Sequence, residues 1–316
     1  MKKIILLAIT LLLAFSLFAC QNQSDDTPET TAPETENEMP EANPASDFEY
    51  RFTQNQEYIL ITKYIGKTKN VVIPSEIEGR KVITLYGTDV DGFLQGVFQD
   101  SNIETVVIPN TVLAISNRSF KNCTSLTSVT IKNNSELLTI CIEAFENCSS
   151  LSKINLPNSI TTIEAKAFYG CSSLVEIDLP NELTELGKDA IVNCTSLKKI
   201  SIPTKVSLDS GFYGNAAIYN NPTLEEVVFE EGWQEINGYV FIVTSSTVKV
   251  TIPKSVTAIC PMIFGNNVKM NIYFSGDCPQ LLERDYFVGN VTIYYDSNTA
   301  GWDATPLKNV HTLIPY

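Results

Sequence analysis

The sequence is poor in the groups on which most enzymes and nucleic-acid-binding proteins depend. It has one histidine, His311, near its end, and neither a phosphate-binding glycine loop nor a nucleophile elbow. Basic residues are scarce, with 22 lysines and arginines against 36 aspartates and glutamates. Nucleic acids and anionic lipids attract clustered positive charge, so neither is expected as a partner. The composition also gives no reason to expect catalysis, a cofactor or a metal.

Long apolar runs are missing too, apart from one at the start. Lys2 and Lys3 precede an apolar stretch over 4–18, which is too short to span a bilayer comfortably and is typical of an export signal. The tetrapeptide over 17–20, Leu-Phe-Ala-Cys, then resembles a bacterial lipobox, in which the cysteine is lipidated. The alternative is an ordinary secretory signal with an incidental cysteine. We expect a signal peptide over 1–19 and acyl chains on Cys20 that anchor the protein in a bacterial cell envelope.

The segment that follows lacks both bases and large apolar side chains. Residues 21–47 contain eight acids and four prolines. Such a segment cannot bury enough apolar surface to offset the entropy lost on ordering, and its like charges repel. We expect residues 20–47 to form a lipidated cysteine and a disordered tether. Without the two lysines of the signal and the eight acids, the net charge changes from −14 to −8.

What the sequence does have is one motif that occurs four times. It occupies 122–126, 147–151, 170–174 and 193–197, and its cysteines are 25, 23 and 23 residues apart. A fixed period of this length is typical of a solenoid, in which windings of the chain stack and bury a shared interior. Each copy leads into an apolar run. In the winding over 160–180, the residues expected to face the interior are Ile160, Ile163, Ala167, Phe168, Leu174, Ile177 and Leu179.

The two ends of the repeated region differ from its middle. Apolar residues alternate with polar ones on both sides of a polar break at 53–57, which predicts a β-hairpin that caps the first winding. A glycine-rich insert over 86–95 should bulge from one winding. We therefore expect a cap over 48–70, a solenoid over 71–275, and a C-terminal repeat and cap over 276–316.

The repeat also resembles a known one. The pattern Cys-x-Ser-Leu-x-x-Ile-x-Leu-Pro-x-x-Ile-x-x-Ile-x-x-x-Ala-Phe, at 148–168, is similar to the leucine-rich repeat of BspA-like bacterial surface proteins, over about 71–274. Lys132-Asn133 replaces Leu-Pro in one copy, and the segments 204–222 and 261–264 also depart from the pattern. The resemblance implies a repeat solenoid with a parallel β-sheet on one face and short turns or irregular helical segments on the other. It also implies a protein-binding or adhesive role at the cell surface.

The column of cysteines allows three interpretations. A zinc site is unsuitable, because residues one winding apart form a row whereas zinc needs four converging ligands. Disulfides between neighbouring windings are geometrically allowed, and an exported protein meets oxidising conditions. We favour buried thiols, because the position is an interior turn in which a small side chain packs. Cys141 and Cys260 occupy another repeat position, and Cys278 is unassigned.

One set of carboxylates raises the question of glycoside hydrolysis. Glu176 and Asp178 share a strand face, and Glu225 and Glu226 lie two windings away. Paired carboxylates are the groups that glycosidases use. Lysines stand alongside, at 153, 198 and 199, which favours a charge-balanced, solvated sheet face.

The outward positions of the predicted sheet define a candidate binding face. Its residues are Glu104, Thr105, Thr127, Ser128, Thr130, Lys153, Asn155, Glu176, Asp178, Lys198, Lys199, Ser201, Glu225 and Glu226. Tyr273, Tyr294 and Trp302 are candidate aromatic contacts for a sugar or a partner, although packing in the cap is the favoured interpretation. We expect a non-enzymatic surface protein that contacts proteins of a host or neighbouring cell. The alternatives are a lipoprotein that binds or processes glycans, and a structural envelope protein.

Overall fold

A computed structural model describes residues 40–90, 93–207, 217–236, 241–242, 247–259, 268–281 and 289–316. The chain divides into two compact units, Met1–Pro40 and Glu41–Tyr316, and the windings lie in the second. The signal, Cys20, most of the tether and Cys260 fall outside the described residues, as do 208–216 and 261–264. The helical elements among the described residues are two 3-10 turns, η1 (Ala45–Asp47) and η3 (Pro306–Asn309). Neither is long enough to cross a membrane.

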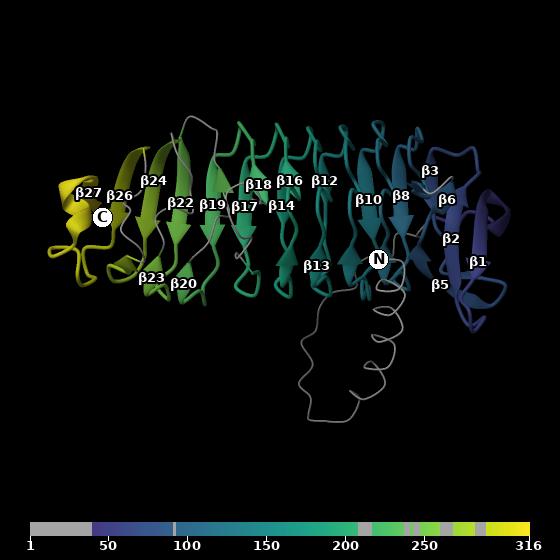
Figure 1. The fold of residues 1–316 in the computed structure, drawn as a ribbon, viewed down its shortest axis with the longest axis horizontal. Coiled ribbons are helices and arrows are strands. Elements are labelled where there is room, and N and C mark those ends of the chain that lie inside the picture. The colour runs from purple at the N-terminus through teal and green to yellow at the C-terminus, as the bar shows by residue number, and fades with distance from the viewer. Residues whose placement is uncertain are drawn as a thin grey trace, which may run out of the picture. The chain divides into compact units, whose positions relative to one another are not determined.

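Successive windings contribute parallel strands to one sheet, here called the front sheet (Figure 1). Its strands are β3 (Asn70–Val72), β8 (Thr105–Ile108), β10 (Ser128–Ile131), β12 (Lys153–Ile154), β14 (Glu176–Asp178), β17 (Lys199–Ile202), β19 (Glu226–Phe229), β22 (Val248–Ile252), β24 (Val268–Phe274), β26 (Gly289–Tyr295) and β27 (Thr312–Pro315). The ladder is interrupted between β12 and β14, where the Val175 amide still donates to the Ser152 carbonyl at 3.2 Å. This sheet confirms the predicted stack of windings.

The opposite side of the windings, here called the rear, also forms parallel ladders. Its strands are β2 (Ile59–Tyr64), β5 (Arg80–Leu85), β9 (Ala114–Ile115), β11 (Thr139–Ile140), β13 (Thr162–Ile163) and β15 (Glu185–Leu186), and then β20 (Glu235–Ile236), β23 (Ala258–Ile259) and β25 (Gln280–Leu281). The helical segments implied for this side do not occur in its described residues. The Thr-Ile pairs at 139–140 and 162–163 are β-branched and favour the extended conformation instead.

A third side carries a shorter ladder of β16 (Ile191–Val192), β18 (Ile218–Tyr219) and β21 (Phe241–Ile242). Two antiparallel additions interrupt the regular windings. The glycine-rich insert forms a hairpin of β6 (Thr88–Val90) and β7 (Phe93–Gln95), and β4 (Glu76–Ile77) pairs with β5. The insert therefore leaves the winding and returns to it without breaking the stack.

The predicted hairpin cap is present at the start of the solenoid. Strand β1 (Phe48–Phe52) pairs antiparallel with β2, and β2 in turn pairs parallel with β5 of the first winding. The folded part begins earlier than the expected residue 48, however. The Asn43 side chain accepts a hydrogen bond from the Val72 amide at 2.7 Å, and its amide group donates to Asp47 at 2.9 Å. These contacts attach the end of the expected tether to β3.

The interior is filled by the apolar residues that the repeat pattern predicted. In the winding that contains β14, Leu174, Ile177 and Leu179 are at most 3% exposed, whereas Glu176 and Asp178 on the same strand are exposed. The far-side residues Ile160, Ile163, Ala167 and Phe168 are fully buried. Strand alternation therefore places one set of side chains in a continuous core and leaves the other on the front face.

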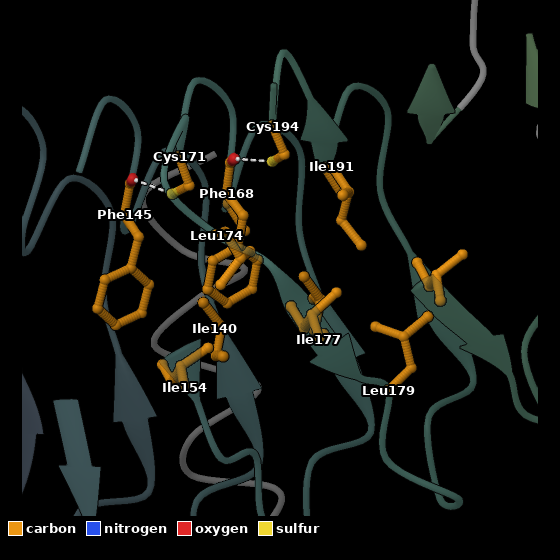
Figure 2. Packing of buried hydrophobic residues seen from close by; sticks show 14 of the residues in the cluster. Ile140, Phe145, Ile154, Phe168, Cys171, Leu174, Ile177, Leu179, Ile191 and Cys194 are labelled. Atoms are coloured by element: carbon orange, nitrogen blue, oxygen red, sulfur yellow. Dashed lines mark hydrogen bonds between the residues drawn. The ribbon is translucent and has the colours of Figure 1, made fainter. Parts of the chain in front are cut away.

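Phenylalanines form a stacked column through this core. The rings of Phe98, Phe120, Phe145 and Phe168 lie parallel, with centroids 5.0, 5.0 and 5.3 Å apart and interplanar angles of at most 5°. The cysteine column lies beside it (Figure 2). The Cys171 thiol donates to the Phe145 carbonyl at 3.2 Å, and the Cys194 thiol donates to the Phe168 carbonyl at 3.3 Å. Each of these thiols thus donates to a backbone carbonyl of the preceding winding.

The four cysteines of this column, at 123, 148, 171 and 194, are free thiols, as the favoured interpretation predicted. Burial raises the pKa of the Cys123 thiol to about 11 and that of Cys194 to about 12. At pH 8 these thiols should alkylate about a hundredfold more slowly in the folded chain than in guanidinium. A short iodoacetamide pulse followed by peptide mass spectrometry checks this, with the half-buried Cys278 expected to label first. Rapid labelling of the column would contradict a closed core.

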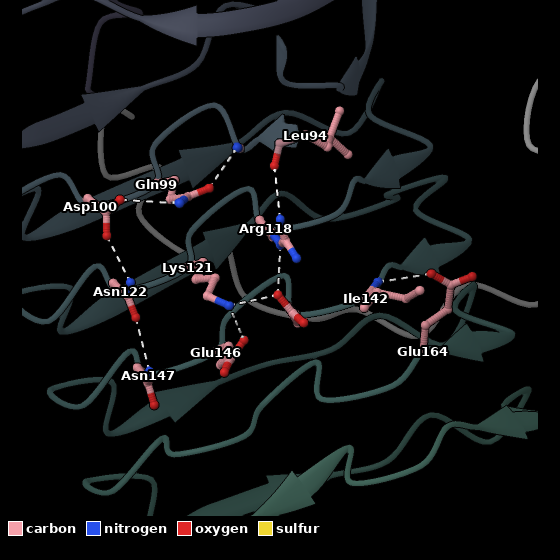
Figure 3. Close-up of polar contacts among 12 residues, drawn as sticks. Leu94, Gln99, Asp100, Arg118, Lys121, Asn122, Ile142, Glu146, Asn147 and Glu164 are labelled. Carbon is pink, nitrogen blue, oxygen red and sulfur yellow. Dashed lines mark hydrogen bonds and ion pairs between the residues drawn. The ribbon is translucent and has the colours of Figure 1, made fainter. Parts of the chain in front are cut away.

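The turn before each cysteine explains the asparagines of the motif. Asn122, Asn147 and Asn193 have positive φ angles near 59°, a conformation that asparagine tolerates better than most residues. The side chains of Asn122 and Asn147 also form a row with Asp100 (Figure 3). Asn122 donates to Asp100 at 2.8 Å, and Asn147 donates to Asn122 at 3.0 Å. The motif therefore encodes a left-handed turn and a hydrogen bond between windings.

A charged cluster joins two windings beside this row (Figure 3). Glu143 accepts hydrogen bonds from Arg118 and Lys121, each at 2.7 Å, and Lys121 also lies 2.7 Å from Glu146. Burial by itself would raise the pKa of the Glu143 carboxyl, but the hydrogen bonds from Lys121 and Arg118 outweigh it and lower the pKa to about 2. The ionised carboxylate is thus stabilised by folding.

This cluster predicts that the stability lost on replacing Glu143 depends on pH. The pKa of Glu143 in the folded chain lies below its ordinary value of 4.5. The ionised carboxylate therefore contributes fully to the free energy of unfolding above pH 4.5, and this contribution is lost as the pH falls towards 2. Glu143→Gln should lower the melting temperature at pH 7, and the gap to the natural chain should narrow between pH 4.5 and pH 2. Thermal unfolding followed by circular dichroism across this range checks it. A gap that stays constant would show that the carboxylate charge contributes nothing.

Candidate functional site

The outward side chains of the front sheet form columns that run across the strands. In the first ladder, one column consists of residues that pair in register, Asn70, Thr105, Ser128 and Lys153. In the next ladder, the same column continues with Glu176, Lys199, Glu226 and Lys249. A second column contains Asp178, Ser201, Val228 and Thr251. The outward residues predicted from the repeat therefore lie in register across neighbouring strands. They also continue past Glu226, which the alternation over 248–252 could have indicated.

Charges of opposite sign alternate along the first column. The Lys153 ammonium lies 2.6 Å from Glu176, while Lys199 and Lys249 lie 3.2 and 3.0 Å from Glu226. We call these five residues the charge ladder. Its side chains are largely exposed, so each pair contributes little to stability. Its main effect is to fix a pattern of charge on the face.

The two carboxyls of the charge ladder do not match the acid of a glycosidase. The hydrogen bond from Lys153 lowers the pKa of Glu176, and the hydrogen bond from Lys249 lowers that of Glu226. Glycoside hydrolysis needs one carboxyl whose pKa is raised so that it can act as an acid. Both carboxyls here are held ionised by lysines. The charge-balanced face is therefore the interpretation that the geometry supports.

The other predicted face residues make contacts within the sheet. Glu104 pairs with Lys69 at 2.7 Å, and Thr105 donates to Asn70 at 2.9 Å. Thr127 donates to the Glu104 carbonyl at 2.9 Å. In a neighbouring column, Lys198 and Glu225 lie 3.5 Å apart. The predicted residues do lie together on one face, and most of their charges are already paired.

A shallow depression of about 180 Å³ interrupts the face between β10 and β12. Its lining residues are Ser128, Val129, Thr130, Ile131, Lys153 and Asn155. Four of these belong to the predicted binding face. Val129 and Ile131 were not predicted, because their repeat positions point inward in a regular winding.

The candidate aromatic contacts separate into two kinds. Trp302 is only 3% exposed, stacks on Tyr295 at 4.9 Å, and donates from its indole to the Gly276 carbonyl at 3.3 Å. It is a core residue of the C-terminal cap, which agrees with the favoured packing interpretation and leaves its ring no exposed face for a ligand. Tyr273 and Tyr294 lie on the front face and stack on each other at 4.4 Å.

This tyrosine pair is poorly suited to stacking on a sugar. One face of the Tyr273 ring is covered by Tyr294, and the Lys249 ammonium lies 5.4 Å from the ring centroid. A sugar ring needs a free aromatic face, so the geometry disfavours the glycan alternative at this position. The pair extends the charge ladder as a cation–π contact instead.

The remaining residues that could carry catalysis or bind a metal do not form a cluster among the described residues. His311 lies between η3 and β27, and burial lowers its pKa. Within the described ranges, no group of three or more His, Cys, Asp or Glu side chains could hold a metal ion. The notable surface is therefore the front sheet with its charge ladder and its depression.

Comparisons with known proteins agree with this architecture. The family described as "BspA type Leucine rich repeat region" matches residues 93–216 and 138–272, in six copies. A leucine-rich repeat protein from Bacteroides ovatus ATCC 8483 is 18% identical with a TM-score of 0.51, over 85% of this chain and 75% of that one. The T. pallidum leucine-rich repeat protein is 23% identical with a TM-score of 0.42, over 66% of this chain and 86% of that one. No curated protein matches. Because the family matches span more than half of its length, this chain belongs to the BspA-type leucine-rich repeat family.

Proposed function

We propose that this chain is a non-enzymatic surface protein that binds other proteins through its front sheet. A lipid on Cys20 anchors it to the cell envelope, and the acidic segment after it holds the solenoid away from the membrane. The partner is a protein of a host or a neighbouring cell. The solenoid acts as a rigid scaffold, and the partner contacts the outward side chains of its front sheet.

The observation that carries this proposal is the open, in-register front face. Its outward side chains are exposed or half-buried from β10 to β22, and no other described element covers them. A broad, uncovered face of this kind is the surface that repeat proteins use for binding. Charges fixed in a pattern favour partner selection and orientation more than raw affinity.

The test is to reverse the charge ladder without disturbing its internal pairing. A variant with Lys153→Glu, Glu176→Lys, Lys199→Glu, Glu226→Lys and Lys249→Glu keeps every opposite-sign neighbour and inverts the pattern that a partner meets. The natural full chain and this variant would be used to capture proteins from host extracellular matrix and from bacterial surfaces. Lys188→Glu, at an exposed residue just after rear strand β15, lowers the net charge by the same amount and is the matched control.

We expect proteins captured by the natural chain and by the rear control to be lost with the reversed ladder. Capture of the same proteins by all three would place binding elsewhere on the molecule. Capture of nothing by the natural chain would remove the support for a binding role.

A further inference from the structure

The depression on the front sheet exists because one strand ends early. β12 stops at Ile154, while β10 continues to Ile131 and keeps its pairing with β8 there. The third apolar position of a front strand is fully buried at Ile108 and Ile202, but Ile131 is only partly buried. This is the winding in which Lys132-Asn133 departs from the repeat pattern. The early end of β12 therefore leaves part of this apolar floor open to solvent.

The rim of the depression carries polar groups that the fold leaves unused. Among the described residues, the side chains of Ser128, Thr130 and Asn155 have no hydrogen-bond partner. The Lys153 ammonium has three donors, and one of them is used by Glu176. Hydroxyl, amide and ammonium donors thus surround one apolar floor.

Lys153 is also the end of the charge ladder. Lys199 stands between two acids in its column, whereas Lys153 has Glu176 on one side and the uncharged Ser128 on the other. The opposite end of the ladder is closed, because Lys249 lies over the Tyr273 ring. An acid placed above Ser128 would continue the alternation by one step. The depression is where such an acid would enter.

We propose that this depression binds a glutamate side chain of the protein partner. The carboxylate would take the two remaining Lys153 donors and the Ser128 and Thr130 hydroxyls, and its methylene stem would lie on Val129 and Ile131. The volume of about 180 Å³ is below the roughly 300–1,000 Å³ of small-molecule pockets, so it suits one side chain rather than a whole ligand. The inference rests on the proposed function, since it assumes a protein partner on the front face.

The experiment uses a probe that needs no knowledge of the partner. The full chain, labelled for NMR at amides and methyl groups, would be titrated with N-acetylglutamate N-methylamide and, separately, with the glutamine analogue. We expect the glutamate probe to shift the signals of Ser128, Thr130, Ile131 and Asn155. The glutamine probe should bind about tenfold more weakly, as should the glutamate probe to Lys153→Gln. Lys199→Gln, within the same ladder, should retain the natural affinity.

Three results would overturn the inference: no shift around the depression, equal shifts with glutamine, or an undiminished response in Lys153→Gln. Each is separable from failure of the proposed function. If the front face still captures proteins while the glutamate probe fails, only the role of the depression is lost. Lys153 is largely exposed, so its replacement leaves the fold intact and the comparison valid.

Discussion

Phe145→Ala is expected to lower the free energy of unfolding by about 4 kcal/mol, and the melting temperature by about 8–16 °C. Phe145 is fully buried and stacks on Phe120 and Phe168 at 5.0 and 5.3 Å. Removing its ring therefore leaves a cavity and breaks two aromatic contacts in the middle of the column. Thermal unfolding monitored by circular dichroism measures the change.

Ile142→Ala is the matched control, because Ile142 lies in the same turn but is 41% exposed. This change should stay within about 0.5 kcal/mol of the natural chain. Comparable losses for the two variants would mean that the phenylalanine column is no more important to stability than the surface of the turn.

Gly96→Ala should be comparably damaging for a different reason. A β-carbon at Gly96 would lie 1.8 Å from the Arg118 carbonyl oxygen of the next winding, so the two windings would have to separate. Overpacking of this kind costs about 1–3 kcal/mol and more when the backbone cannot move. We expect a loss of about 3 kcal/mol, measured as a shift of the urea midpoint.

Gly79→Ala separates this steric effect from backbone strain. Gly79 has a φ of 71°, but nothing lies within 4 Å of an added β-carbon. Gly79→Ala should therefore lower the free energy of unfolding by less than Gly96→Ala does. We expect about 1–2 kcal/mol, which comes from the left-handed conformation alone. If Gly79→Ala proved the more damaging change, close approach of the windings would not be the limiting contact.

The repeat pattern predicted the fold well because each winding depends on the same few interior positions. Leu174, Ile177 and Leu179 could be assigned to the core from their spacing alone, and the register of the front columns followed from aligning the copies. The rear ladder could not be predicted, because two-residue strands such as Thr139–Ile140 are too short to show a period. The role of Asn43 was missed because a single side chain attaches an otherwise acidic, proline-rich segment.

The candidate site was only partly predictable for a related reason. The face residues around Lys153 were identified as outward, but the depression depends on where β12 leaves the ladder. That point is set by the local path of the chain and not by the repeat. Trp302 was assigned as a candidate contact because an aromatic residue near the end of a chain carries no sign of which side it faces. Its indole finds partners inside the cap.

The alternation of sign along the front column depends on the number of windings in this stretch. Deleting the winding that contains Glu176 would bring Lys153 beside Lys199, and like charges on adjacent strands repel. Deleting the next winding as well would bring Lys153 beside Glu226 and restore attraction. A gain or loss of two windings in this stretch therefore preserves the alternation of charge that a partner meets, whereas a gain or loss of one winding interrupts it.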